Sequence, residues 1–189
     1  MLEGELVRLR APEPDDLDRC HRWMNDPEVT RFLEGGRYPL SMAHEREWLD
    51  NAMTNRSGFS NVLLAIETKE GGVHIGNAGL HEASAEHRTA KLGIVIGEKD
   101  CWSKGYGTDT VRTLLRFAFG QMNLNRVELG TFDFNERAQA CYRKCGFVEE
   151  GRRREDRYID GRYCDLLIMG ILRREWEAAS RPHGPSGGQ

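Results

Sequence analysis

Two glycines separated by one residue stand before a strongly helical stretch, in CWSKGYGTDTVRTLLRFAF from Cys101 to Phe119. Glycine permits a tight turn and lets backbone N–H groups approach a ligand closely. The helix that follows would add unpaired N–H groups and the positive end of its dipole. Gly105 and Gly107 therefore predict a backbone site for an anion, and phosphate is a natural ligand for it.

The spacing of this turn excludes two nucleotide-binding motifs. A dinucleotide-binding fingerprint needs a third glycine, and the run GYGTDT has none after Gly107. A P-loop needs Gly-Lys followed by Ser or Thr, whereas Ser103 and Lys104 come before the first glycine. The turn is therefore expected to hold phosphate in some other fold.

The chain has five cysteines and no C-x-x-C pair: Cys20, Cys101, Cys141, Cys145 and Cys164. In a reducing compartment these are expected to remain free thiols. Cys141 and Cys145 lie four residues apart on a predicted helix and could share a metal ion, but no second ligand pair with metal spacing accompanies them. Packed thiols and no metal are therefore expected.

The elements that must position these residues follow from the hydrophobic periodicity. GELVRLRAP predicts a first strand, PEPDDLDRCHRWMNDPEV a helix that stops near Asp26-Pro27, and residues 41–53 a second helix with Ser41 as N-cap. From Phe59 onward the period becomes two. An antiparallel meander is therefore predicted for the segments NVLLAIE, VHIGNAGLHEA and AKLGIVIGE.

The helical period returns after the glycine turn, where one apolar face consists of Val111, Leu114, Leu115, Ala118 and Phe119. NRVELGTFDF predicts the next strand, and NERAQACYRKCGF a helix with Asn135 as N-cap and Gly146 as its stop. A final hairpin turns at Asp160-Gly161. This order predicts an α+β (mixed α/β) fold, with a mixed, mostly antiparallel sheet of about seven strands flanked by helices.

The composition limits the classes of protein to which this chain can belong. The 189 residues, 30% charged and 39% hydrophobic, predict one domain at 1–179 and a disordered tail at 180–189. The chain shows no membrane-length apolar run and no secretory signal, which predicts a cytoplasmic protein without a membrane partner. The net charge of -3 argues against a nucleic-acid partner and is compatible with a cationic substrate.

Several ordered motifs resemble one family. Three segments closely resemble the RimJ/RimL-type branch of the GNAT superfamily of acetyl-CoA-dependent N-acetyltransferases. They are IVIGEKDCWSKGYGTDT, NLNRVELGTFDFNERAQACYRKCGF and EEGRRREDRYIDGRYCDLLIMGILRREW. WMNDPEVTRFL and HIGNAGL also look like that branch, so the resemblance covers roughly residues 4–177. It implies the GNAT fold, with a cleft between separated strands, and acetyl-CoA as co-substrate without a metal.

The resemblance also implies which residues hold acetyl-CoA. Trp102 stands at the Gln or Arg position of the superfamily's phosphate signature, and the two glycines fill the glycine positions. The strand Ile94-Val95-Ile96 would pair with the pantetheine arm like an added strand, although a buried strand without a ligand fits the same apolar run. The pyrophosphate would lie on the backbone amides of Trp102, Ser103, Lys104, Gly105, Tyr106, Gly107 and Thr108.

Two further residues could contact the cofactor. Asn135 matches the family asparagine that contacts the cofactor, and it is also a good N-cap. Lys144, like Arg143, could reach the adenosine phosphates, or could simply belong to a solvated helix face.

Acetyl transfer requires a neutral amine, although amines are largely protonated at pH 7. Tyr142 matches the tyrosine that many GNAT enzymes are thought to use as the acid toward the leaving thiolate; a core tyrosine would fit the same helix. Glu82, Asp165 and His81 remain open candidates for the base. Direct attack by the amine is expected, because no histidine lies near Cys141 to support an acetyl-cysteine.

The resemblance leaves the acceptor open. A protein N-terminal amine, a polyamine such as spermidine, and an amine-bearing small molecule all fit the branch. Because dimers are common in it, a homodimer is also compatible. The rival function is a non-catalytic acyl-CoA-binding or regulatory module of the same fold.

Overall fold

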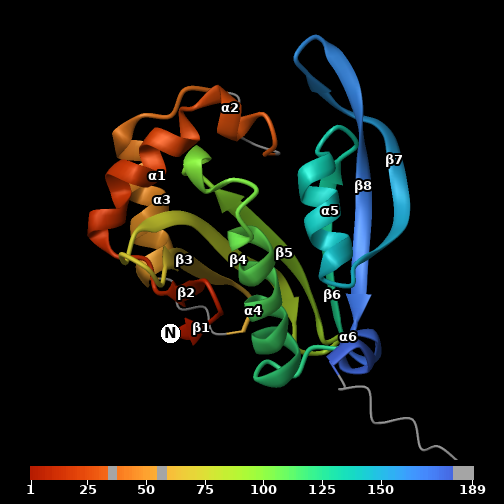
Figure 1. The fold of residues 1–189 in the computed structure, drawn as a ribbon. Coiled ribbons are helices and arrows are strands. Elements are labelled where there is room, and N and C mark those ends of the chain that lie inside the picture. The colour runs from red at the N-terminus through yellow and green to blue at the C-terminus, as the bar shows by residue number, and fades with distance from the viewer. Residues whose placement is uncertain (34–37, 55–58, 181–189) are drawn as a thin grey trace, which may run out of the picture.

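The computed structural model describes residues 1–33, 38–54 and 59–180, which form an eight-stranded sheet with helices packed on it (Figure 1). In sheet order the strands are β1 (Leu2–Glu3), β2 (Val7–Arg10), β3 (Val62–Thr68), β4 (His74–Ser84), β5 (Thr89–Ile96), β6 (Arg126–Phe132), β8 (Arg162–Leu172) and β7 (Val148–Ile159). The helices are α1 (Leu17–Met24), α2 (Pro27–Thr30), α3 (Met42–Thr54), α4 (Tyr106–Gly120), α5 (Glu136–Lys144) and α6 (Arg173–Ser180), with 3-10 turns η1 (Pro14–Asp16) and η2 (Lys99–Cys101). None of the described helices has the length and apolar character of a membrane span.

The predicted mixed, mostly antiparallel sheet is confirmed. Among the described strand pairs, β5 and β6 run parallel and the others antiparallel. The sheet has eight strands where about seven were predicted, because the short strand β1 precedes the first predicted strand and pairs with β2. The Gly4 N–H donates to the Val7 carbonyl (2.8 Å) and closes the turn between them.

The predicted N-terminal helix is divided at the expected proline. α1 ends at Met24 with Asn25 as its C-cap, and Asp26 then caps α2 by accepting from the Glu28 N–H (2.9 Å). At the start of α3, the Ser41 hydroxyl accepts from the His44 N–H (3.2 Å), as its predicted N-cap role requires. The last helix, α6, includes Ser180, where the tail was predicted to begin, and residues 181–189 lie outside the described residues.

Different helices pack on the two faces of β5. Ile94 and Ile96 pack against the main core, which contains Val111 of α4 and Tyr142 of α5. Val95 packs instead with Trp23 of α1 and Val29 of α2, in a second hydrophobic cluster that also contains Cys20 and Trp102. Because successive side chains of a strand alternate between faces, α4 and α5 cover one face of the sheet here, and α1 and α2 cover the other.

Candidate active site

A cavity of about 930 Å³ lies where the parallel strands β5 and β6 separate. The two strands pair only over residues 89–91 and 126–128. Beyond these residues, β5 remains paired to β4 and β6 to β8, so the sheet opens between them. This volume is typical of a site for a small molecule or cofactor.

The open edge of β5 forms one wall of the cavity. Ile94, Val95 and Ile96, the predicted ligand strand, all line it. On this side no strand pairs with them within the described residues, although the Ile96 carbonyl accepts a hydrogen bond from the Trp102 indole (2.7 Å). The other backbone groups of this edge offer donors and acceptors to an extended, amide-bearing ligand.

The glycine turn leads directly into α4. Ser103 and Gly105 have φ of 60° and 90°, values that favour a tight turn. In the part of the chain that the structure describes, the backbone N–H groups of residues 103–108 donate to no protein acceptor. Unpaired donors at a helix start make an anion site. The cavity lining includes Trp102, Ser103, Gly105, Gly107 and Thr108, but neither Lys104 nor Tyr106 among the described residues.

Asp109, in the first turn of α4, binds this helix to the N-terminal hairpin of β1 and β2. Its buried carboxylate accepts hydrogen bonds from the backbone N–H groups of Glu5 (3.0 Å), Leu6 (2.7 Å) and Val7 (3.0 Å). A β-carbon on Gly105 would lie 3.3 Å from Leu6 Cδ1, so the hairpin also supports the turn. Asp109 therefore positions the start of α4 without lining the cavity.

Replacing Asp109 with alanine should lower the free energy of unfolding by about 2 kcal/mol, because three backbone N–H groups lose their acceptor. Urea unfolding of the full chain measures the loss. Asp100→Ala, the same change at an exposed position of η2, is the matched control and should stay within about 0.5 kcal/mol of the parent chain. Equal stability of the two variants would contradict the positioning role.

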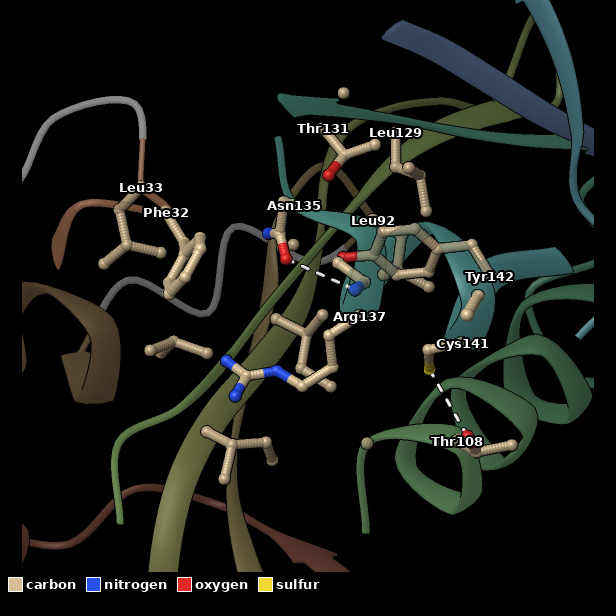
Figure 2. A pocket seen from close by; sticks show the side chains of 18 of the residues that line it. Phe32, Leu33, Leu92, Thr108, Leu129, Thr131, Asn135, Arg137, Cys141 and Tyr142 are labelled. Atoms are coloured by element: carbon tan, nitrogen blue, oxygen red, sulfur yellow. Dashed lines mark hydrogen bonds between the residues drawn. The ribbon is translucent and has the colours of Figure 1, made fainter. Parts of the chain in front are cut away.

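Tyr142 points from α5 into the cavity (Figure 2). The ends of α5 are as predicted: the Asn135 side-chain oxygen accepts from the Ala138 N–H (3.2 Å), and Gly146 follows the helix at φ 95°. The Tyr142 ring packs against Phe147, and its hydroxyl has no hydrogen-bond partner within the described residues. Burial raises the pKa of Tyr142 well above its usual value, so the hydroxyl keeps its proton at neutral pH and can donate it.

His81 lies at the end of the cavity where the two strands separate. It pairs across β4 and β5 with Lys91, the last residue of β5 that is paired to β6. The half-buried imidazole lies close to Gly93, where a β-carbon would be 3.1 Å from His81 Nε2. Burial lowers the pKa of His81, against a smaller raising effect of Glu82, so the imidazole is neutral at pH 7 and can accept a proton.

Glu82 also lines the cavity, but its carboxylate already has a partner. The Lys91 ammonium lies 2.5 Å from Glu82 Oε2, and both side chains are largely exposed. The Lys91 ammonium therefore occupies one oxygen of the Glu82 carboxylate.

Asp165 lies outside the described lining of this cavity. Its carboxylate accepts hydrogen bonds from the Glu155 N–H (2.9 Å) and from Arg152 Nη1 (3.0 Å). These donors hold the pKa of Asp165 below its usual value. Asp165 borders a separate hollow on the β7–β8 hairpin, with Arg153 and Arg154. The structure therefore does not bring Asp165 together with Tyr142.

The remaining predicted residues on α5, Asn135 and Lys144, both line the cavity. Cys141 lies beside them and accepts a hydrogen bond from the Thr108 hydroxyl (3.4 Å), as Figure 2 shows. A hydrogen bond from Cys145 lowers the pKa of Cys141 to about 7. All five cysteines are free, and no group of three metal-binding side chains occurs in the described ranges.

Arg137 is a cavity residue that the sequence patterns did not single out. Its guanidinium lies 3.9 Å from the centre of the Trp102 indole and 5.4 Å from that of the Phe32 ring, so it reaches from α5 across the cavity (Figure 2). Arg137 lies in the first turn of α5, where a cation opposes the helix dipole. Such a departure from local preference is typical of functional positions. It is the feature of the sequence that could have indicated Arg137 as a site residue.

Comparison with known proteins identifies the relatives of this chain. Residues 7–148 match the family model described as an acetyltransferase (GNAT) domain. The chain is 34% identical over 170 residues to the spermidine N(1)-acetyltransferase of Vibrio cholerae, covering 90% of this chain and 95% of that protein. It is 30% identical over 176 residues to the "Putative ribosomal N-acetyltransferase YdaF" of Bacillus subtilis, covering 92% and 95%. The structure of spermidine N-acetyltransferase from Vibrio cholerae with CoA and spermine aligns with a TM-score of 0.82 at 27% identity, covering 92% of this chain and 99% of that one.

Proposed function

The chain belongs to the GNAT family of acetyl-CoA-dependent acetyltransferases, and on this premise we propose that it acetylates a primary amine by direct attack of the amine on the acetyl group. The observation that carries the proposal is the separation of β5 from β6. It joins the anion-binding turn, an open strand edge and a buried proton donor in one cavity. Transfer of an acetyl group from acetyl-CoA, which is long and phosphorylated, needs these three parts in one place.

The cofactor would lie along this cavity. The unpaired N–H groups at the start of α4 suit its pyrophosphate, and the open edge of β5 from Ile94 to Ile96 suits the amides of its pantetheine arm. Asn135 and Lys144 would add side-chain contacts from α5. When bound, acetyl-CoA supplies an acetyl thioester that is activated toward amines.

Two side chains would move the protons. The acceptor amine arrives largely protonated, since α-amino groups titrate near pH 8 and lysine-like amines above about 10. His81, neutral in its half-buried position, would take this proton directly or through water. Tyr142 would give its proton to the sulfur as the bond between carbon and sulfur breaks. Each such transfer typically contributes about 10²-fold or more to a rate.

Replacing Gly105 with valine should weaken acetyl-CoA binding by about ten-fold. A branched side chain strains a backbone at φ 90° and would contact Leu6, so the N–H groups of the turn would shift. Calorimetric titration of the full chain with acetyl-CoA measures the effect. Gly120→Ala, at the far end of α4 with open space around it, is the control and should bind normally. Unchanged affinity in Gly105→Val would contradict the phosphate-binding role of the turn.

The domain would extend beyond the matched residues 7–148. We propose that it includes β7, β8 and α6 up to residue 179, because β8 pairs with β6 along seven residues of the central sheet. The RimJ/RimL-type branch is likewise a proposal, which rests on the motifs of the turn, of α5 and of the last hairpin.

Mass spectrometry after incubation with acetyl-CoA tests the function across N-terminal peptides, polyamines and aminoglycosides. The relatives support two of these classes, because one is a spermidine acetyltransferase and another is named for a ribosomal substrate. An acetyl mass gain on any amine would support the proposal. Acetyl-CoA binding without transfer to any member of the panel would favour the non-catalytic acyl-CoA-binding module.

A further inference from the structure

Three arginines share two adjacent aromatic rings beside the cavity. Arg31 lies over Phe32 (5.5 Å) and Phe134 (5.8 Å), Arg137 over Phe32 (5.4 Å), and Arg162 over Phe134 (5.4 Å). The two ring centres are 5.9 Å apart. We call Arg31, Arg137 and Arg162 the arginine cluster. It joins residues from three distant parts of the chain around one small apolar surface.

Among the described residues, the three arginines of the cluster have one carboxylate partner. Arg31 forms an ion pair with Asp160 (3.3 Å), whereas neither Arg137 nor Arg162 has a carboxylate partner within the described residues. All three arginines remain partly exposed and open to a ligand. Burial against its neighbours lowers the pKa of Arg137, as expected for a cation without a counter-ion. A bound anion would relieve this imbalance and could form paired hydrogen bonds with the guanidinium groups.

The cluster brings Arg137, which belongs to α5, to aromatic residues that pack on the opposite face of the sheet. Trp102, beneath Arg137, packs with the α1 and α2 residues Trp23 and Val29. Phe134 packs with Phe132, which points away from the face where the alternate residue Leu129 meets the main core. The rings of Phe32 and Trp102, which Arg137 covers, therefore line the cavity on the side of α1 and α2.

The carboxylates of the described cavity lining, Glu82 and Glu128, are both already paired. Glu82 contacts Lys91 (2.5 Å), and Glu128 contacts Arg126 (3.0 Å). A polycation entering the cavity would therefore meet unpaired arginines and no free carboxylate among these residues. Charge complementarity favours the opposite kind of acceptor.

We propose that the acceptor of this enzyme is a primary amine that also carries an anionic group, carboxylate or phosphate, and that the arginine cluster binds this group. The inference rests on the proposed function, because it names the substrate class of the same site. Arg137 is its specificity residue, since it both lines the cavity and belongs to the cluster.

The test is binding of simple probes to the full chain saturated with CoA, so that the cofactor already occupies its own phosphate sites. O-phosphoethanolamine should bind at least about ten-fold tighter than ethanolamine, which lacks the phosphate, and spermidine should bind no tighter than ethanolamine. Arg137→Gln should reduce this preference about ten-fold, and Arg137→Lys should retain part of it. Arg154→Gln removes one charge from β7 outside the described cavity lining and should change it less than about two-fold.

Several outcomes would overturn the inference: tighter binding of spermidine than of O-phosphoethanolamine, or equal losses in the Arg137 and Arg154 variants. A weaker affinity of Arg137→Gln for CoA, with the probe preference intact, would assign Arg137 to the cofactor and also defeat it. Thermal unfolding shows whether each variant is folded. Because these are binding measurements, a failure of acetyl transfer with the preference intact would count against the proposed function alone.

Discussion

Replacing Tyr142 with phenylalanine should lower kcat by about 100-fold and leave the affinity for acetyl-CoA nearly unchanged. The change removes one hydroxyl, and the ring keeps its packing against Phe147. That hydroxyl has no partner within the described residues and its pKa is raised, so it is a protonated donor held for a ligand. Steady-state kinetics with an amine acetylated in the panel, together with calorimetry, would separate the rate from the binding.

The control for this prediction is the same change at Tyr163. That ring is 65% exposed on β8 and lies against Tyr158, remote from the described cavity lining. Tyr163→Phe should keep kcat within about two-fold of the parent chain. If Tyr142→Phe also turned over normally, its hydroxyl would have only a structural role, and a water molecule would have to protonate the thiolate.

Local signals in the sequence were enough to predict the elements that hold the site. The Asn135 cap, the Gly146 stop and the apolar face after Gly107 each depend on residues a few positions apart, and the structure has α4 and α5 where they indicate. The anion-binding turn follows in the same way, because its donors belong to consecutive residues. Such short-range patterns survive folding because tertiary contacts reinforce them.

The open cavity and its charges could not be predicted in this way. Whether Glu82 or Asp165 faces Tyr142 depends on where β5 stops pairing with β6, and on which donors the β7–β8 hairpin places around Asp165. The arginine cluster brings together residues more than 100 positions apart. The net charge of -3 is compatible with a cationic acceptor, whereas the described residues beside the cavity include three arginines around two aromatic rings and one paired carboxylate, Asp160.

Replacing His81 with glutamine should lower kcat/KM by about 100-fold at pH 7, because glutamine is similar in size but cannot accept the proton of the amine. Asp165→Asn is the matched control outside the described cavity lining and should have little effect. Glu82→Gln tests the neighbouring carboxylate. A larger loss there than in His81→Gln would assign the base to Glu82.

The pH profile separates these bases independently of the size of the loss. Burial lowers the pKa of His81, so its neutral, proton-accepting form persists to lower pH than that of an exposed histidine. The charged groups beside it are Glu82 and Lys91, with Glu128 on β6. With kcat/KM expressed per protonated amine, the form from which His81 takes the proton, activity should rise with pH through the lowered His81 pKa and then level off. This limb should vanish in His81→Gln, whereas a carboxylate base would give a limb near pH 4 that His81→Gln retains.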